Sequence, residues 1–203
     1  DTENSEILET IEQEALAADV PIIRREMQSF LEVLLLMKKP MRVLEVGTAV
    51  GFSALLMSEY VPEECAITTI ENYEKRIPIA RENFIRAEKE EQITLLEGDA
   101  KDVLETLTEP FDLIFMDAAK GQYLNFLPRV LELLQPEGIL ISDNVLQDGD
   151  IIESRFAVTR RNRTIHKRMR EYLYTLTHSE ELTTAVLPVG DGITISTKKG
   201  RKA

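Results

Sequence analysis

Two carboxylates and an amide lie directly after two apolar, strand-like runs, and side chains of these types can bind a cation. Asp117 follows FDLIFM, and Asp143 with Asn144 follows GILIS. Because the carboxyl ends of neighbouring parallel strands meet at one edge of a sheet, we expect these side chains to lie together. Carboxylate and amide oxygens are hard ligands that suit Mg²⁺. The sequence therefore predicts a magnesium site with coordination positions left open for water or substrate.

A glycine-rich turn after an earlier strand-like run predicts a second ligand site. Gly47 and Gly51, in EVGTAVGFS, let the backbone turn tightly beneath a ligand. Glu71 ends the next strand-like run, and its carboxylate suits the two hydroxyls of a ribose. Ala49 stands where a dinucleotide fingerprint has its middle glycine, which argues against a pyrophosphate. S-adenosylmethionine therefore fits this turn better than NAD.

Strand and helix patterns alternate along the chain, and they would place these residues at strand ends. TTAVLPV and GITIST flank GDG, which predicts a closing antiparallel hairpin. The sequence thus predicts an α/β fold with a doubly wound, Rossmann-like, mostly parallel seven-stranded sheet. The other strands are expected at residues 42–46, 66–71, 92–98, 111–117 and 138–143. Helices are expected at residues 3–18, 22–38, 52–60, 73–89, 101–107, 121–134 and 154–177.

Composition limits the class of protein. With 203 residues, 43% of them hydrophobic, the chain suits one domain, with N-terminal helices at 1–38 and a cofactor-binding core at 39–203. A formal net charge of −12 opposes binding of the whole surface to nucleic acid or to an anionic membrane. No apolar stretch is long enough for a membrane span, so we expect a cytoplasmic protein. Two histidines and one cysteine are too few for a zinc cluster.

Five ordered motifs carry a family resemblance. EVGTAVGFS, TTIENYEKR, EGDAKD, FMDAAKGQY and LISDNV resemble those of class I S-adenosylmethionine-dependent, divalent-metal-dependent O-methyltransferases of the catechol and caffeoyl-CoA type. The resemblance runs from about Val20 to PVGDGITIS near the C-terminus. It implies that Asp117, Asp143 and Asn144 bind the metal, and that Lys120, as the candidate base, is catalytic together with Asp117. It implies cofactor contacts from Ile23, Glu45, Gly47, Ser53, Glu71, Asp99, Ala100 and Asp117.

The expected substrate follows from a narrower resemblance and from charge. DAAKGQY and PVGDG most resemble the bacterial branch of this family that includes tRNA 5-hydroxyuridine methyltransferase. Residues 155–170 contain seven basic residues and no acid, which predicts an anion-facing patch. We therefore expect tRNA as the partner and 5-methoxyuridine as the product. The RNA would be bound through Arg24, Arg25, Arg160, Arg161 and Arg163.

Other functions stay open on sequence alone. A small catechol or a caffeoyl-CoA-like phenol also offers two adjacent oxygens to a metal, and the phosphates of a CoA ester would also suit the basic segment. A non-catalytic protein that binds an adenosyl ligand would need no metal. An NAD-dependent oxidoreductase would need the missing glycine and a hydride site. The apolar FLEVLLLM helix suits either a core or the interface of the homodimer that we expect.

Overall fold

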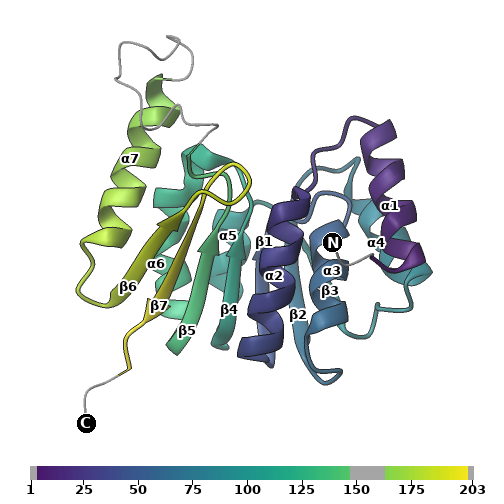
Figure 1. Ribbon diagram of the computed structural model, residues 1–203, viewed down its shortest axis with the longest axis horizontal. Helices are drawn as coiled ribbons and strands as arrows, with labels where there is room; N and C mark the ends of the chain where they lie inside the picture. Colours follow the sequence, from purple (N-terminus) through teal and green to yellow (C-terminus); the bar gives the residue numbers. More distant parts are fainter. Residues whose placement is uncertain (1–3, 147–162, 201–203) are drawn as a thin grey trace. The chain divides into compact units, whose positions relative to one another are not determined.

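Helices and strands alternate in the computed structural model, which describes residues 4–146 and 163–200 (Figure 1). The chain forms two compact units, Asp1–Val103 and Leu104–Ala203. The strands are β1 (Arg42–Val46), β2 (Ala66–Glu71), β3 (Ile93–Glu97), β4 (Phe111–Met116), β5 (Leu134–Ser142), β6 (Leu182–Leu187) and β7 (Ile193–Lys198). The helices are α1 (Glu6–Ala17), α2 (Arg25–Lys38), α3 (Phe52–Tyr60), α4 (Ile77–Arg86), α5 (Ala100–Thr106), the 3₁₀ helix η1 (Lys120–Gln122), α6 (Tyr123–Leu133) and α7 (Arg163–Thr177).

The first unit is built on three parallel strands. β2 pairs with β1 on one side and with β3 on the other. β1 is buried at four of its five residues, as expected for a parallel strand that reads as a continuous apolar run. Among the helices, α3 packs against α1, α2 and α4. Because the three strands run in the same direction, the loops that follow them emerge at one edge of the sheet.

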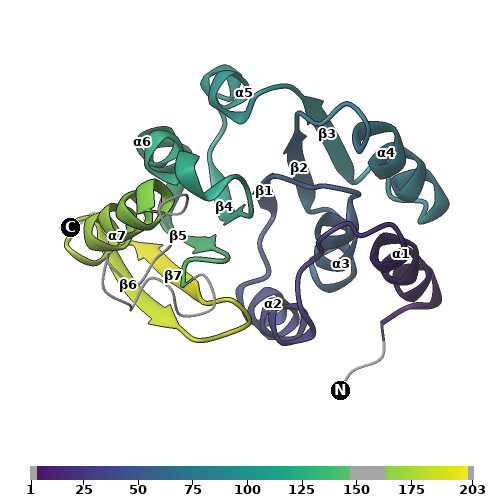
Figure 2. The ribbon, with the colours of Figure 1, turned by 90° about the horizontal axis from the view of Figure 1, so that it is seen from above.

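The second unit contains the mixed part of the sheet. β4 and β5 are parallel, whereas β7 runs antiparallel to both β5 and β6. α6 and α7 lie side by side, and α7 also packs against β6 (Figures 1 and 2). α7 turns Met169, Tyr172 and Leu176 inward at helical spacing. β4 and β5 end level with each other, since Met116 pairs with Ser142, so the two predicted ligand segments follow directly.

The predicted fold class is confirmed. The seven strands form one mostly parallel sheet, in the order β3-β2-β1 within the first unit and β4-β5-β7-β6 within the second. β6 and β7 are the predicted antiparallel hairpin. The described part of the predicted helix at 154–177 is confirmed as α7, while residues 154–162 lie outside the described part of the chain. The prediction of a single domain divided at residue 38 stays a prediction.

The junction between α6 and β5 differs from the predicted one. The sequence predicted a helix at 121–134 and a strand at 138–143, but α6 ends at Leu133 and β5 begins at once at Leu134. The Pro-Glu-Gly stretch at 136–138 predicted a break, and the strand instead absorbs it as an irregularity in the β4–β5 register. Glu137 has a positive φ of 62° at this point. Within residues 4–146 and 163–200, none of the helices is long and apolar enough to span a membrane.

Candidate active site

The turn after β1 is tight and demands unusual backbone conformations. Gly47, Ala49 and Gly51 have φ values of 94°, 49° and 86°, in the left-handed region that glycine enters most easily. A Cβ atom added to Gly51 would lie 2.6 Å from Cε1 of Phe84 in α4. The N–H of Gly47 donates to the carbonyl of Ile70 in β2 at 3.0 Å. The turn thus passes close to both β2 and α4, as expected for backbone that approaches a ligand.

Glu71 ends β2 and binds the backbone around it. Its Oε2 accepts the N–H of Ala49 at 2.8 Å, and its Oε1 accepts the N–H groups of Asn72 and Tyr73 at 2.9 and 2.8 Å. The bond to Ala49 helps to hold this non-glycine residue at positive φ. A carboxylate has about four acceptor positions, so one position on Oε2 remains for a hydroxyl. The prediction that both ribose hydroxyls bind Glu71 therefore requires one of them to share an acceptor with the backbone.

Glu45 and Ser53, both predicted cofactor contacts, are bonded to each other. Ser53 Oγ donates to Glu45 Oε1 and Thr69 Oγ1 donates to Glu45 Oε2, each at 2.5 Å. Glu45 is fully buried, and burial raises the pKa of its carboxyl group, an effect that the hydrogen bond from Ser53 partly offsets. These bonds link β1 to β2 and α3 inside the unit. Contacts of Glu45 and Ser53 with the cofactor stay a prediction.

Three further predicted cofactor residues of the first unit lie after β3 or before α2. Asp99 is exposed after β3, and its Oδ1 accepts the N–H of Lys101 at 2.9 Å, so it caps the start of α5, where Ala100 is half-buried. Ile23 is buried just before α2, and its carbonyl accepts the side-chain amide of Gln28 at 3.1 Å. Their roles toward adenine and the methionine end of the cofactor stay predictions.

The three predicted metal ligands lie together in the second unit. Asp117 follows β4 and Asp143 follows β5, and the N–H of Asp143 donates to the carbonyl of Met116 at 2.9 Å. Asn144 donates its backbone N–H to Asp143 Oδ1 at 2.7 Å and its side-chain Nδ2 to Asp117 Oδ1 at 3.3 Å. Asn144 adopts a left-handed conformation, with φ of 59°. This turn bends the chain so that one asparagine contacts both carboxylates.

The electrostatics of this cluster suit a divalent cation. Asp143 is 5% exposed, and its burial together with the nearby Asp117 carboxylate raises its pKa to about 7. The N–H of Asn144 and the ammonium of Lys120 lower the pKa of Asp143 and so partly offset this rise. Two carboxylates that oppose each other's ionisation are an arrangement that a cation relieves. The donor set of two carboxylates and one amide therefore fits Mg²⁺, provided that Asn144 presents its amide oxygen.

Asn144 is needed to complete that set. Within residues 4–146 and 163–200, no group of three or more His, Cys, Asp and Glu side chains is placed to hold a metal ion. The candidate site consequently depends on an amide as its third member, as the sequence predicted. In the structure the amide turns its NH₂ toward Asp117, so coordination would require rotation of this side chain.

Lys120 begins the turn that follows Asp117. It is half-buried at the first position of η1, and its ammonium lowers the pKa of Asp143. Arg168 of α7 donates from Nη1 to the carbonyl of Gly121 at 2.8 Å, which anchors the turn. Lys120 therefore lies within electrostatic reach of Asp143. Its role as a base stays a prediction.

Arg24 and Arg25, predicted to contact RNA, lie at the start of α2. Arg25 forms ion pairs with Glu12, to which it also donates a hydrogen bond, and with Glu9 at 3.9 Å. Arg24 is exposed at the position just before the helix. Arg25 is thus engaged with acidic side chains of α1, which reduces the charge that it can offer to a phosphate.

The predicted basic segment is described only at its end. Arg160 and Arg161 lie outside the described residues, and for Arg163 only the backbone at the start of α7 is described. Further along, Lys167 pairs with Glu171 at 3.6 Å, while Arg168 bonds to the backbone of η1. The prediction of an anion-facing patch stays a prediction.

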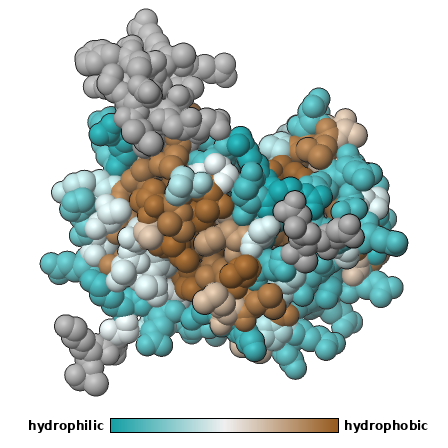
Figure 3. Space-filling view, viewed as in Figure 1, coloured by the Kyte–Doolittle hydropathy of each residue, from teal (hydrophilic) through white to brown (hydrophobic). Residues whose placement is uncertain are grey.

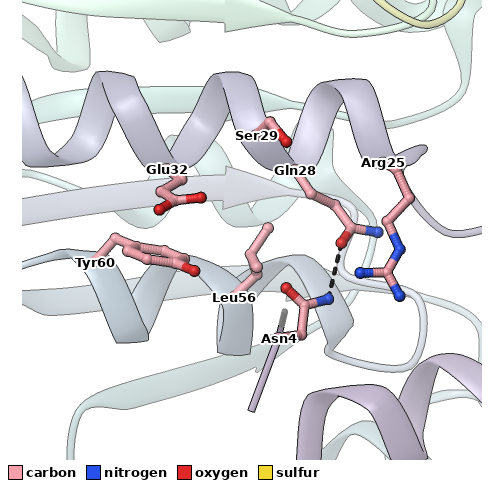
Figure 4. Close-up of a pocket in the computed structure, with 7 residues that line it drawn as sticks. All are labelled: Asn4, Arg25, Gln28, Ser29, Glu32, Leu56 and Tyr60. Carbon is pink, nitrogen blue, oxygen red and sulfur yellow. Dashed lines mark hydrogen bonds between the residues drawn. The ribbon is translucent and has the colours of Figure 1, made fainter. Parts of the chain in front are cut away.

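A cavity in the first unit is lined by none of the predicted cofactor residues. It has a volume of about 140 Å³. The side-chain amide of Asn4 bonds to Gln28 at 2.9 Å on one side of it, near Arg25 (Figure 4). No local sequence pattern predicts the role of Gln28, because its bonds to Asn4 and Glu12 join segments 24 and 16 residues apart in the chain. The lining residues are Asn4, Arg25, Gln28, Ser29, Glu32, Leu56 and Tyr60.

Known proteins resemble this chain over nearly its whole length. The family model described as O-methyltransferase matches residues 1–199. A catechol O-methyltransferase from Niastella koreensis is 33% identical over 128 residues, which are 61% of this chain and 58% of that protein. Caffeoyl-CoA O-methyltransferase 2 from Populus trichocarpa is 31% identical over 177 residues, which are 82% of this chain and 70% of that protein.

Solved structures agree with the sequence matches. A putative caffeoyl-CoA O-methyltransferase from Staphylococcus aureus is 32% identical, with a TM-score of 0.89 over 96% of this chain and 93% of that one. An O-methyltransferase from Bacillus cereus, solved in complex with SAH, is 25% identical, with a TM-score of 0.85 over 97% of this chain and 92% of that one. These matches favour the predicted methyltransferase over the NAD-dependent oxidoreductase.

Proposed function

Because the chain belongs to the O-methyltransferase family, whose members use S-adenosylmethionine, we propose that it is a Mg²⁺-dependent enzyme that methylates one of two adjacent oxygens of an aromatic substrate. The observation that carries this proposal is the grouping of Asp117, Asp143 and Asn144 at the ends of β4 and β5. The two relatives named for catechol and for caffeoyl-CoA support it.

The first unit would bind the methyl donor. Its glycine turn offers backbone that can approach a ligand closely, and Glu71 keeps one acceptor position for a ribose hydroxyl. The Bacillus cereus relative in complex with SAH supports this assignment, since SAH is S-adenosylmethionine without its methyl group. The loops after β2 and β3 lie next to each other, because the N–H of Gly98 donates to the carbonyl of Glu71 at 3.0 Å.

The second unit would bind and activate the nucleophile. Asp117, Asp143 and Asn144 would hold a cation, which supplies orientation of two adjacent substrate oxygens and a lower pKa for the reacting hydroxyl. Lys120, already close enough to lower the pKa of Asp143, would accept or electrostatically stabilise the departing proton. Arg168 would keep the Lys120 turn in place through its bond to Gly121.

Metal dependence is tested with a simple catechol as substrate. Activity should disappear in excess chelator and return with Mg²⁺, while binding of SAH is retained. Asp143→Ala should lose activity in the presence of Mg²⁺. Asp112→Ala, which removes another aspartate of the β4 segment, serves as the matched control and should remain active. Full activity in excess chelator would rule out the proposed role of the cluster.

A second candidate substrate is 5-hydroxyuridine in tRNA, which we propose on the observation that residues 155–170 contain seven basic residues and no acid. Its 5-hydroxyl and O4 carbonyl are adjacent oxygens, so the same cluster could serve it. Phosphate contacts from the basic segment would add affinity without reading sequence. The phosphates of a CoA ester would suit that segment equally well.

Comparison of the two substrates decides between these candidates. Replacing Arg160, Arg161 and Arg163 together by alanine should weaken binding of tRNA and flatten its salt dependence, because fewer counterions are released. Methylation of a small catechol by the same variant should change little. In cells that lack the gene, nucleoside digests of tRNA should contain less 5-methoxyuridine. Unchanged digests would leave the small phenol as the substrate.

The proposed homodimer would need an apolar surface, and α2 offers one. Val33, Leu36 and Met37 are 57, 52 and 78% exposed along this helix, and apolar surface is visible where α2 faces the viewer (Figure 3). Burial of such a stripe against a second copy would be favourable. Met37→Lys should shift the mass measured by light scattering toward the monomer if the stripe forms the interface.

A further inference from the structure

Tyr123 is a buried tyrosine for which neither the sequence motifs nor the proposed chemistry gives a role. It is the first residue of α6, directly after the turn that carries Lys120, and it is 0% exposed. Its hydroxyl lies 3.0 Å from the carbonyl oxygen of Met116 and 3.1 Å from that of Asp143. Both acceptors are carbonyl oxygens, so the phenol must act as the donor.

The two carbonyls belong to the segments that carry the candidate metal ligands. Met116 immediately precedes Asp117 at the end of β4, and the other carbonyl is that of Asp143 itself. The strand pairing ends at Met116 and Ser142, after which the N–H of Asp143 still reaches the carbonyl of Met116. The shared hydroxyl of Tyr123 thus adds a link at the point where the regular pairing stops.

The ring of Tyr123 is itself held in place by α7. Tyr172 meets it edge to face, with ring centroids 5.3 Å apart and planes at 69°. Tyr172 is also 0% exposed, and its hydroxyl lies 2.5 Å from Ser142 Oγ. A packed ring leaves the hydroxyl of Tyr123 little freedom, which makes it suitable for fixing two backbone segments at a set spacing.

We propose that Tyr123 is a positioning residue, whose hydroxyl sets the distance between the Asp117 and Asp143 carboxylates by holding the backbone of both segments. Tyr123 contacts neither substrate nor cation in this role and acts only through the two carbonyls. The inference rests on the proposed function, because it assumes that the two carboxylates share a cation. Residues that orient metal ligands typically contribute about 10- to 100-fold to metal affinity.

The test compares two buried tyrosines that differ in what their hydroxyls hold. Tyr123→Phe removes the bond to the ligand segments, whereas Tyr172→Phe removes a buried hydroxyl that bonds to Ser142 Oγ. Binding of Mn²⁺ is followed by electron paramagnetic resonance in saturating SAH, which also favours the folded state. Tyr123→Phe should weaken Mn²⁺ binding by about 10-fold or more, with SAH affinity unchanged, and Tyr172→Phe should stay within about twofold of the parent.

Rescue separates the donor from the ring. Tyr123→p-aminophenylalanine restores N–H donors toward the two carbonyls and should restore most of the Mn²⁺ affinity. Equal loss in the two phenylalanine variants would overturn the proposal, as would Mn²⁺ affinity that Tyr123→Phe leaves unchanged. A Tyr123→Phe chain that does not fold in saturating SAH also counts against it, because the hydroxyl would then serve the fold as a whole. If the parent protein itself does not bind Mn²⁺, the proposed function fails as well.

Discussion

The carboxylates of β1 and β2 in the first unit and those that follow β4 and β5 in the second unit differ in how their negative charge is stabilised. In the first unit, Glu71 accepts three backbone N–H groups and Glu45 accepts two hydroxyls, so the chain itself occupies most of their acceptor positions. In the second unit, Asp117 and Asp143 lie close enough for one to raise the pKa of the other. The first arrangement is stable by itself, whereas the second is relieved by a positive charge.

This difference teaches which residues the fold needs and which the chemistry needs. Removing Glu71 releases backbone donors, so it should disturb the loops as well as the cofactor. Removing Asp117 or Asp143 should abolish activity, because a metal ligand is lost. It should not weaken the fold, because the repulsion between the two carboxylates is relieved. Stability and function are therefore expected to fall together when Glu71 is replaced, and activity alone is expected to fall when Asp117 or Asp143 is replaced. The following variants test that expectation.

The largest effect is expected for Asp117→Asn. Loss of a metal carboxylate removes several kcal/mol of transition-state stabilisation, equivalent to about a thousandfold or more in activity. In the absence of added metal, however, the free energy of unfolding should not fall, because Asp143 no longer opposes a like charge. Urea unfolding and a catechol methylation assay measure the two quantities. A variant that loses both stability and activity would break the comparison.

Glu71→Ala should have the next largest effect. We expect S-adenosylmethionine binding to weaken by about 1 to 3 kcal/mol, since a charge-assisted acceptor is lost in a partly buried site. The three released N–H groups should also lower the free energy of unfolding. Isothermal calorimetry and urea unfolding give both values, with Glu74→Ala in the neighbouring loop as the control. Cofactor affinity equal to that of the parent would remove Glu71 from the cofactor site.

Gly51→Ala tests how tightly the glycine turn after β1 is constrained. Gly51 has a φ of 86°, and an added Cβ would lie 2.6 Å from Phe84, so alanine would be strained at this position. We expect the free energy of unfolding to fall by about 1 to 3 kcal/mol. Gly121→Ala is the matched variant in the turn after Asp117, where the added Cβ would lie 3.8 Å from Arg168 Nη1, an ordinary van der Waals distance. That variant should lie within about 0.5 kcal/mol of the parent. Equal losses would show that the two loops are equally constrained.

Glu45→Gln should produce the smallest effect, visible as a change with pH. Burial raises the pKa of the Glu45 carboxyl group above its usual value, so the folded state binds this proton more tightly than the unfolded state. The resulting stabilisation is present at low pH and is lost as pH rises through the folded-state pKa. The advantage of the parent over Glu45→Gln, measured by urea unfolding across the pH range, should therefore shrink as pH rises. An advantage independent of pH would contradict the raised pKa.

The sequence predicted the grouping of Asp117, Asp143 and Asn144, because the carboxyl ends of neighbouring parallel strands meet at one edge of a sheet. It did not predict what depends on contacts between distant residues. The hydroxyl of Tyr123 and the bond from Arg168 to Gly121 join segments without a local sequence signal. The three backbone bonds of Glu71 depend on turn geometry that periodicity does not encode. The prediction for the start of β5 was also wrong, because the proline and glycine at 136–138 predict a break, whereas the strand begins at Leu134.

The amide of Asn144 has a consequence for the rate at which a cation could be taken up. Its bond to Asp117 measures 3.3 Å, longer than most hydrogen bonds of this type, and the side chain is only partly buried. Rotamer changes of accessible side chains take picoseconds to nanoseconds. Mg²⁺, by contrast, gives up its water reluctantly. We therefore expect the time course of magnesium loading to be governed by dehydration of the ion, and Asn144→Asp to change the equilibrium affinity far more than the association rate measured by stopped flow.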